Sequence, residues 1–360
     1  MNLLFVQGGE LVKKDDLGNY YTSGSFNDIV WERYKAVADS LTIILKCDSH
    51  VYDHAELETK FNRIDLDKVN LIAVDNLYIP KYKFFNFYKR KQISEKINEA
   101  VRKSDKVILR PVSNFYTATA WKACKKYGKT YLLEVTGHVW DARWYSGWKG
   151  KLLAYPDSIR MKKAARQAPY TLYVTQSDLQ NSYPCDGVTI GCSDVVLPHT
   201  DREILNHRIE HISAVRGKYW IGTIGGYSKL KGQKLVLKAM GLLKREGIDN
   251  IEYQLVGGGN MDEIKADAEK YGVSNQVVAL GSMEHNQVFA WLDKIDVYIQ
   301  PSYQEGLCRS VVEAISRACP VICSDACGNS ELANHKYIFN RGGVATLAGM
   351  IKELLFSNEN

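Results

Sequence analysis

The sequence predicts an α/β protein made of two doubly wound parallel sheets, and two observations support this fold class. Short apolar runs typical of buried strands alternate along the chain with segments whose apolar residues recur at helical spacing. The chain also has 360 residues, of which 45% are hydrophobic, so it can form two cores of ordinary domain size. A polar stretch at residues 200–216 is the expected linker, which gives domains at residues 1–205 and 206–360.

In the first half, strands are expected at residues 3–6, 41–45, 71–74, 106–109, 130–135 and 170–175. Helices are expected between them at residues 26–38, 93–102, 118–127, 150–167 and 177–183. The first strand runs into Gly8 and Gly9, where the backbone can approach a ligand closely. We expect a long loop to continue from there to Ser25, and we expect residues 187–199 to be irregular.

In the second half, strands are expected at residues 219–224, 253–256, 277–280 and 297–299, each followed by a turn and a helix. The carboxyl ends of parallel strands form the edge at which open α/β sheets bind ligands. The turn after the first of these strands contains Gly225, Gly226 and Lys231. A glycine-rich turn that leads into a helix amino end and carries a lysine is a reasonable cradle for a phosphate group.

Residues 300–313 read Gln-Pro-Ser-Tyr-Gln-Glu-Gly-Leu-Cys-Arg-Ser-Val-Val-Glu and predict a strand end, a turn and a helix start. Gly306 lets a ligand approach the unpaired N–H groups of the new helix, which favour an anion. Glu305 and Glu313 are separated by seven residues. A carboxylate set back from the helix amino end in this way can accept hydrogen bonds from sugar hydroxyls.

This stretch resembles the E-x7-E element of retaining glycosyltransferases of family 4, the group 1 glycosyl transferases. The match continues through residues 320–332, and Lys231-Gly232 matches the family's Lys-Gly turn, so the resemblance is specific over residues 215–335. It implies the GT-B fold, in which two Rossmann-like domains face each other across a cleft. It also implies transfer of a sugar from a nucleotide-sugar donor to an acceptor hydroxyl, without a cofactor or metal ion, as in surface polysaccharide or glycolipid assembly.

The resemblance assigns roles to individual residues. The implied catalytic residues are Glu305, Lys231 and His138, which follows the strand at residues 130–135. The implied donor-binding residues are Gly225, Gly226, Lys229, Lys231, Gly257, Ser282, Met283, Gly306, Leu307, Arg309 and Glu313. The implied acceptor-binding residues are Gly8 and Gly9. One departure is that the arginine common upstream of the lysine is absent, and Thr223 occupies the nearest position.

Two other functions are compatible with the same pattern. One is a nucleotide-sugar 2-epimerase on this fold, which would need no acceptor, and the other is a donor-binding partner protein that has lost catalysis. The joint presence of Lys231, Glu305 and Glu313 disfavours the inactive protein. Asp65 and Asp67 imitate the metal-binding pair of the other major glycosyltransferase fold, but a solvated turn is expected there, and no metal site is predicted.

The charge distribution bears on possible partners. The chain has a net charge of +6, and the first 200 residues carry +7. Residues 78–91 hold five basic and six aromatic residues, which suits an anionic membrane interface but also a helix that packs its rings on the sheet. No nucleic-acid motif is present, so no nucleic acid is expected as a partner. Without a long apolar run, the protein is expected in the cytoplasm, and a peripheral position at the inner face of the membrane is the alternative that residues 78–91 leave open.

Overall fold

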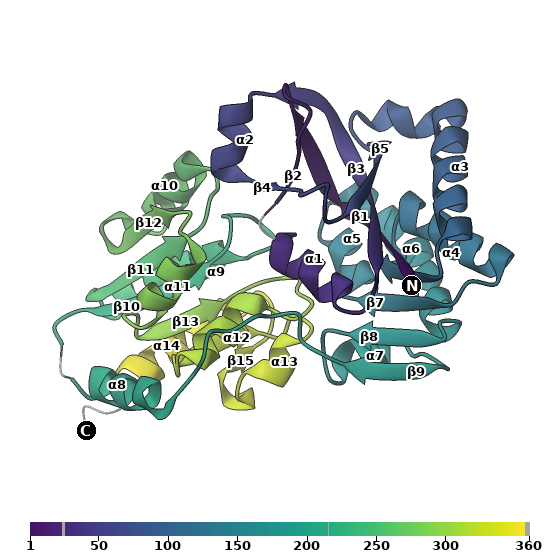
Figure 1. Cartoon of the computed structure of the whole chain (residues 1–360). Helices are drawn as coiled ribbons and strands as arrows, with labels where there is room; N and C mark the ends of the chain where they lie inside the picture. Colours follow the sequence, from purple (N-terminus) through teal and green to yellow (C-terminus); the bar gives the residue numbers. More distant parts are fainter. Residues whose placement is uncertain (24–25, 215, 357–360) are drawn as a thin grey trace. The chain divides into compact units, whose positions relative to one another are not determined.

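The computed structural model describes residues 1–23, 26–214 and 216–356 and shows an α/β chain with two compact units, each built on its own sheet (Figure 1). The first unit comprises Met1–Val139, Tyr155–Tyr173 and Gln180–Gly191. The main part of the second unit starts at Cys192. Two segments from the first half of the sequence, Trp140–Ala154 and Val174–Leu179, also belong to this unit. The two sheets confirm the predicted fold class.

The sheet of the first unit has seven parallel strands in the order β5-β3-β1-β6-β7-β8-β9. Their bounds are β1 Asn2–Asp15, β3 Ser40–Tyr52, β5 Asn70–Asp75, β6 Lys106–Arg110, β7 Tyr131–Val135, β8 Tyr170–Tyr173 and β9 Val188–Gly191. Two short strands, β2 (Tyr20–Thr22) and β4 (Asn62–Arg63), continue the sheet in antiparallel fashion from the far end of β1. The middle strands are buried on both faces because helices cover them.

The helices that connect these strands are α1 Asp28–Lys35, α2 His54–Lys60, α3 Phe87–Lys103, α4 Phe115–Tyr127, α5 Val139–Trp144, α6 Trp148–Arg166 and α7 Asp178–Ser182, with a short 3₁₀ helix η1 at Lys81–Phe85. Three of them begin at asparagines whose side chains accept hydrogen bonds from backbone N–H groups of the first turn, namely Asn27, Asn86 and Asn114. Such caps satisfy donors that the helix itself leaves unpaired. None of the helices in the described parts of the chain is both long and apolar enough to cross a bilayer.

The predicted loop after Gly9 is wrong, because β1 continues through both glycines to Asp15. The register of β1 against β3 shifts between Val6 and Leu11, so the glycines lie in a bulge inside the strand. The Gln7 side chain stabilises this bulge by accepting hydrogen bonds from the N–H groups of Gly9 (2.7 Å) and Glu10 (2.6 Å). The expectation of an irregular run at residues 187–199 is likewise wrong for residues 188–191, which form the edge strand β9.

The predicted linker at residues 200–216 contains a helix, α8 (Arg202–Ser213). Asp201 caps it by accepting hydrogen bonds from two backbone N–H groups. The helix is fixed by the buried guanidinium of Arg208, which donates to the carbonyl oxygens of Leu292 and Ile295, each at 2.6 Å. Because a charged residue makes this buried contact, the apolar spacing of the sequence does not reveal the helix.

The sheet of the second unit is entirely parallel, in the order β12-β11-β10-β13-β14-β15. Its strands are β10 Tyr219–Ile224, β11 Ile251–Val256, β12 Val277–Gly281, β13 Val297–Gln300, β14 Val321–Ser324 and β15 Ile338–Phe339. Its connecting helices are α9 Gln233–Arg245, α10 Met261–Lys270, α11 His285–Leu292, α12 Arg309–Ser316, α13 Asn329–Leu332 and α14 Val344–Phe356. Figure 1 shows the strands of this unit side by side, and every one of them leads from its carboxyl end into a turn and a helical segment.

Two apolar clusters cover the second sheet. One contains Val236 and Met240 from α9 together with Leu347 and Ile351 from α14. The other contains residues of α11 and α12, including Trp291 and Val311. With both faces of the sheet occupied by packed helices, the turns at the carboxyl ends of the strands are the part of this unit best placed to meet a ligand.

Candidate functional site

The carboxyl ends of β10, β11 and β12 run into glycine turns that pack directly on one another. The N–H of Gly225 donates to the carbonyl of Val256 (2.8 Å), and the N–H of Gly257 donates to the carbonyl of Gly281 (2.7 Å). Gly257 has φ of +132°, and a Cβ there would lie 2.7 Å from the backbone of Gly225. These turns therefore require glycine, as the sequence predicts for a site of close backbone approach.

Lys231 brings the first of these turns to the turn that follows β13. Its ammonium Nζ lies 2.8 Å from Oε1 of Glu305, 74 residues further along the chain. The next residue, Gly232, has φ of +70° and directly precedes α9 as its N-cap, and a Cβ there would lie 2.1 Å from the carbonyl oxygen of Pro301. The predicted lysine and glutamate are thus held together by the close approach of two backbone turns.

Glu305 is buried, and its Oε1 accepts two further hydrogen bonds, from Nε2 of Gln300 (3.1 Å) and Oγ of Ser302 (2.6 Å). Burial on its own lowers the pKa of Lys231, but attraction to the Glu305 carboxylate outweighs it, so that pKa lies above its usual value. The lysine is therefore a fixed positive charge at neutral pH. A fixed cation among glycine turns can bind the oxygens of a phosphate or diphosphate group.

Glu313 lies one turn into α12 and is 9% exposed. Its Oε1 lies 3.0 Å from Nε2 of His285, the first residue of α11. The pair connects α12 to the segment that follows β12, in which Ser282 and Met283 are the predicted donor-binding residues. His285 was not predicted from the sequence, although its position just after the glycine turn that ends β12 is a signal that could have indicated it.

Other predicted residues of the second unit lie around this pair of turns. Gly306 and Leu307 are half-buried just before α12, and Arg309 is exposed at its first position. Lys229 is exposed on the turn that contains Lys231. Thr223 does not replace the absent arginine, because it is buried within the sheet and its hydroxyl donates to the carbonyl of Ile299 at 2.9 Å.

The predicted residues of the first unit have separate surroundings. Gly8 lies in the bulge of β1, where a Cβ would come within 2.2 Å of the Asn114 side chain. His138 follows β7, and its Nε2 lies 2.7 Å from the hydroxyl of Ser182. Its ring also packs on Tyr183, with the ring centroids 5.4 Å apart. The roles of Gly8, Gly9 and His138 toward a substrate stay predictions.

Asp65 and Asp67 lie in the turn that follows β4, beside a hollow of about 470 Å³. The Asp65 carboxylate accepts a hydrogen bond from the N–H of Asp67 (3.0 Å) and lies 3.5 Å from the ammonium of Lys68. Across the residues that the structure describes, no group of three or more His, Cys, Asp or Glu side chains is arranged to hold a metal ion.

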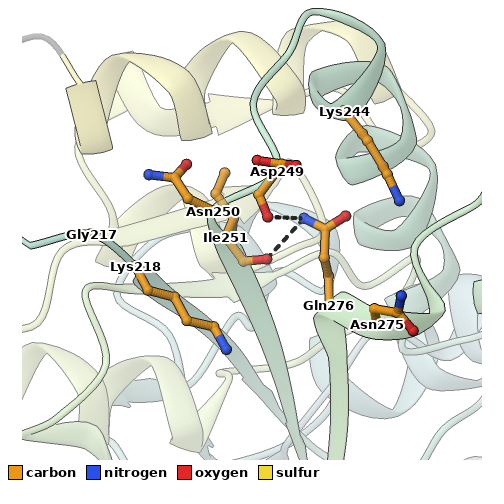
Figure 2. A pocket seen from close by; sticks show the side chains of 8 residues that line it. All are labelled: Gly217, Lys218, Lys244, Asp249, Asn250, Ile251, Asn275 and Gln276. Atoms are coloured by element: carbon orange, nitrogen blue, oxygen red, sulfur yellow. Dashed lines mark hydrogen bonds between the residues drawn. The ribbon is translucent and has the colours of Figure 1, made fainter.

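A second hollow, of about 290 Å³, lies at the opposite edge of the second sheet, where β10, β11 and β12 begin (Figure 2). Figure 2 shows the Gln276 amide donating to the backbone carbonyls of Asp249 (3.1 Å) and Ile251 (3.0 Å). Two lysines line the hollow, and both have partners in the protein. Lys218 donates to the Glu252 carboxylate, and Lys244 donates to the backbone carbonyl of Gly272. These hydrogen bonds and the Lys218–Glu252 ion pair hold the starts of the strands together.

Known proteins resemble this chain in sequence. The profile of the family described as "Glycosyl transferases group 1" matches residues 208–360. Over the whole chain the sequence is 34% identical to Protein CapJ of Staphylococcus aureus, in an alignment of 363 residues that covers 88% of CapJ.

Solved structures resemble the chain in fold. HepE of Anabaena, solved in complex with UDP and glucose, superposes with a TM-score of 0.65 at 15% identity, covering 100% of this chain and 91% of HepE. The lipopolysaccharide outer core galactosyltransferase WaaB gives a TM-score of 0.58 at 14% identity, with coverage of 100% and 91%. These findings confirm the resemblance seen in the sequence: the chain belongs to the group 1 glycosyl transferases and has their GT-B fold.

Proposed function

We propose that the protein is a retaining, metal-independent glycosyltransferase of family 4 that acts in the cytoplasm. It moves a sugar from a nucleotide-sugar donor to the hydroxyl of a sugar or lipid-linked acceptor, in the assembly of a surface polysaccharide or glycolipid. The observation that carries the proposal is the ion pair of Lys231 and Glu305, whose Nζ and Oε1 atoms lie 2.8 Å apart. This pair joins the turn that begins at Gly225 to the turn that precedes α12, and the backbones of the two turns are in close contact. The likeness in fold to HepE, whose structure holds UDP and glucose, supports a nucleotide-sugar donor.

In the proposed reaction, the bond between the sugar C1 and the donor's diphosphate oxygen breaks while the acceptor oxygen bonds to C1 on the same face. The acceptor's proton passes to the departing diphosphate. The negative charge that grows on the diphosphate is stabilised by Lys231, by Arg309 and by the N–H groups at the start of α12, which follow Gly306. Because these groups neutralise the charge, the reaction needs no metal ion.

Other predicted residues have supporting roles in this scheme. Glu313 accepts hydrogen bonds from the ribose hydroxyls, and backbone groups of Ser282 and Met283 contact the base. Glu305 and His138 contact the donor sugar. The bulge at Gly8 and Gly9 contacts the acceptor.

The test compares two Lys-to-Ala variants of one domain in a transfer assay. Nucleotide sugars are first screened by thermal shift, since a true donor raises the Tm by mass action, and turnover is then measured with and without excess chelator. Lys231→Ala is expected to lower kcat/KM by about 10²–10³-fold, as loss of a preorganised charge-stabilising group does. Lys218→Ala removes the Lys–Glu pair at the opposite edge and is expected to stay within about twofold.

The anomeric configuration of the product, followed by NMR, tests the retaining mechanism. A product of inverted configuration would refute it, and activity that is lost on chelation and restored by Mg²⁺ or Mn²⁺ would refute metal independence. Conversion of the nucleotide sugar to an epimer in the absence of any acceptor would show an epimerase instead.

A further inference from the structure

The segment from Ile79 to Lys91 in the first unit, called here the aromatic–basic segment, exposes five large apolar side chains. These side chains, with the exposed fraction of each residue, belong to Ile79 (65%), Tyr82 (73%), Phe85 (72%), Phe87 (76%) and Tyr88 (72%). Tyr82 and Phe85 are three residues apart in the 3₁₀ helix η1, so their side chains lie on the same face. Large apolar side chains concentrated in this way mark an interaction surface more often than isolated ones do.

An inner layer of aromatic rings holds the segment in place. Phe84 stacks on Tyr78 with ring centroids 5.7 Å apart, and the Phe115 ring lies 6.3 Å from that of Phe84. The guanidinium of Arg90 lies over the rings of Phe84 (4.8 Å) and Phe115 (5.2 Å). Phe84 thus packs inward, as expected for rings that pack on the protein, whereas Phe87 is exposed.

The charge of the segment is one-sided, with five basic residues and no acidic one between Tyr78 and Lys91. Two of the five have structural partners: Arg90 lies over the rings, and Lys89 forms a 2.8 Å ion pair with Asp75. The other three basic residues, Lys81, Lys83 and Lys91, lie in sequence beside the exposed rings. Among the described contacts, the ammonium of Lys83 lies 3.3 Å from the hydroxyl of Ser49, and that of Lys91 lies 4.0 Å from the Glu95 carboxylate.

We propose that the aromatic–basic segment docks the protein on the surface of an anionic lipid bilayer. Tyrosine and phenylalanine rings partition to the headgroup level of a membrane, and nearby lysines are attracted to anionic lipid. The segment itself contains five basic residues and no acidic one, and this excess of positive charge favours an anionic lipid surface over a protein partner. That the docked face delivers a lipid-linked acceptor rests on the proposed function, whereas the docking itself does not.

The test is co-sedimentation of the full chain with vesicles of neutral lipid alone or of neutral lipid with anionic lipid, at two salt concentrations. The wild type is expected to bind anionic vesicles, less at high salt, and to bind neutral vesicles weakly. Replacing Lys81, Lys83 and Lys91 by Gln is expected to reduce binding to anionic vesicles on the order of 100-fold at low salt. The Phe85→Ala, Phe87→Ala double variant is expected to lose the part of binding that salt does not weaken.

The matched control replaces three exposed lysines of α4, Lys122, Lys125 and Lys126, by Gln. If this control weakens binding as much as the segment variant does, general charge and not the segment is responsible, and the proposal fails. It also fails if the wild type binds neither vesicle, or binds neutral and anionic vesicles equally.

Docking and catalysis are separated by two further measurements. Lys231→Ala is expected to keep full vesicle binding, and the segment variants are expected to keep wild-type turnover with a soluble acceptor. Loss of catalysis in Lys231→Ala therefore bears on the proposed function alone, and thermal melting of each variant verifies that it is folded.

Discussion

The two edges of the second sheet carry similar groups but differ in how the chain encloses them. Each edge has a Lys–Glu ion pair, Lys231 with Glu305 at the carboxyl edge (2.8 Å) and Lys218 with Glu252 at the amino edge (2.6 Å). The first joins two turns that are distant in sequence, whereas the second joins the starts of neighbouring strands and leaves the Lys218 side chain 54% exposed. The Lys231–Glu305 pair is thus distinguished by the backbone that closes around it and not by the ion pair itself.

Replacing one glycine at each edge tests this difference and has the largest expected effect on stability. Gly232 and Gly247 both have positive φ (+70° and +85°), but a Cβ on Gly232 would meet the carbonyl of Pro301 at 2.1 Å, while nothing lies within 4 Å of one on Gly247. Gly247→Ala is expected to cost about 1–2 kcal/mol, for the left-handed backbone alone. Gly232→Ala adds a backbone clash and is expected to cost more than about 3 kcal/mol.

Urea unfolding of the two glycine variants provides the measurement, with the free energy of unfolding extrapolated to water. Equal losses in both variants would mean that the turn at Pro301 yields without cost, and the carboxyl edge would then be no more enclosed than the amino edge.

The carboxyl edge was largely predictable from the sequence because its signals are local. Gly225, Gly257 and Gly306 each follow an apolar strand within a few residues, and each strand is followed by a helix. The ion pair between Lys231 and Glu305 could not be predicted from such local signals. Their contact depends on Gly232 meeting Pro301, a packing event between segments about 70 residues apart.

The strand and the helix that the sequence did not predict are stabilised by hydrogen bonds of a polar side chain and not by burial of regularly spaced apolar residues. Gln7 supports the bulge that carries β1 past Gly8 and Gly9, so a strand continues where glycines suggested a loop. Arg208 anchors α8 through backbone carbonyls, so a helix forms where polarity suggested a linker. The spacing of apolar residues reflects which side chains are buried, and it gives no information about such hydrogen bonds.

The second prediction compares buried and exposed glutamates in nucleotide binding. Glu313→Ala is expected to raise the Kd for the nucleoside diphosphate by about 10–100-fold, because in the proposed donor site this carboxylate accepts hydrogen bonds from the ribose. His285→Ala is expected to have a smaller effect, since His285 acts through its 3.0 Å contact with Glu313. Glu246→Ala, which removes an exposed ion pair with Lys352, provides the control and should leave the Kd unchanged.

Calorimetry with the nucleoside diphosphate gives these affinities, and the double variant Glu313→Ala, His285→Ala shows whether the two residues act together. An unchanged Kd in Glu313→Ala would place this carboxylate outside the donor site. A double variant no weaker than Glu313→Ala would show that His285 only positions the carboxylate.

The smallest expected effect concerns how a carboxylate is held at each edge as the pH changes. Glu331, at α13, accepts hydrogen bonds from the N–H groups of Gln176 (2.6 Å), Ser177 (2.9 Å) and Asp178 (2.6 Å) within the second unit. Burial on its own raises the pKa of Glu331, but these donors outweigh it and hold that pKa below the usual 4.5. The pKa of Glu252 is also lowered, since hydrogen bonds from Lys218 and Gln254 outweigh the raising effect of burial.

Because the folded-state pKa of Glu331 is lowered, its stabilisation is present above pH 4.5 and is lost as the pH falls through the folded value. Glu331→Gln is therefore expected to cost about 1 kcal/mol at pH 7, with the difference from wild type shrinking below pH 4.5. Fixed backbone donors are insensitive to salt, so 0.5 M NaCl should leave this difference unchanged. Glu252→Gln should cost only a few tenths of a kcal/mol, and salt should remove that cost because an exposed lysine supplies much of the attraction. A Glu331→Gln difference that stays constant down to pH 3, or disappears in salt, would show that the backbone donors do not hold this carboxylate.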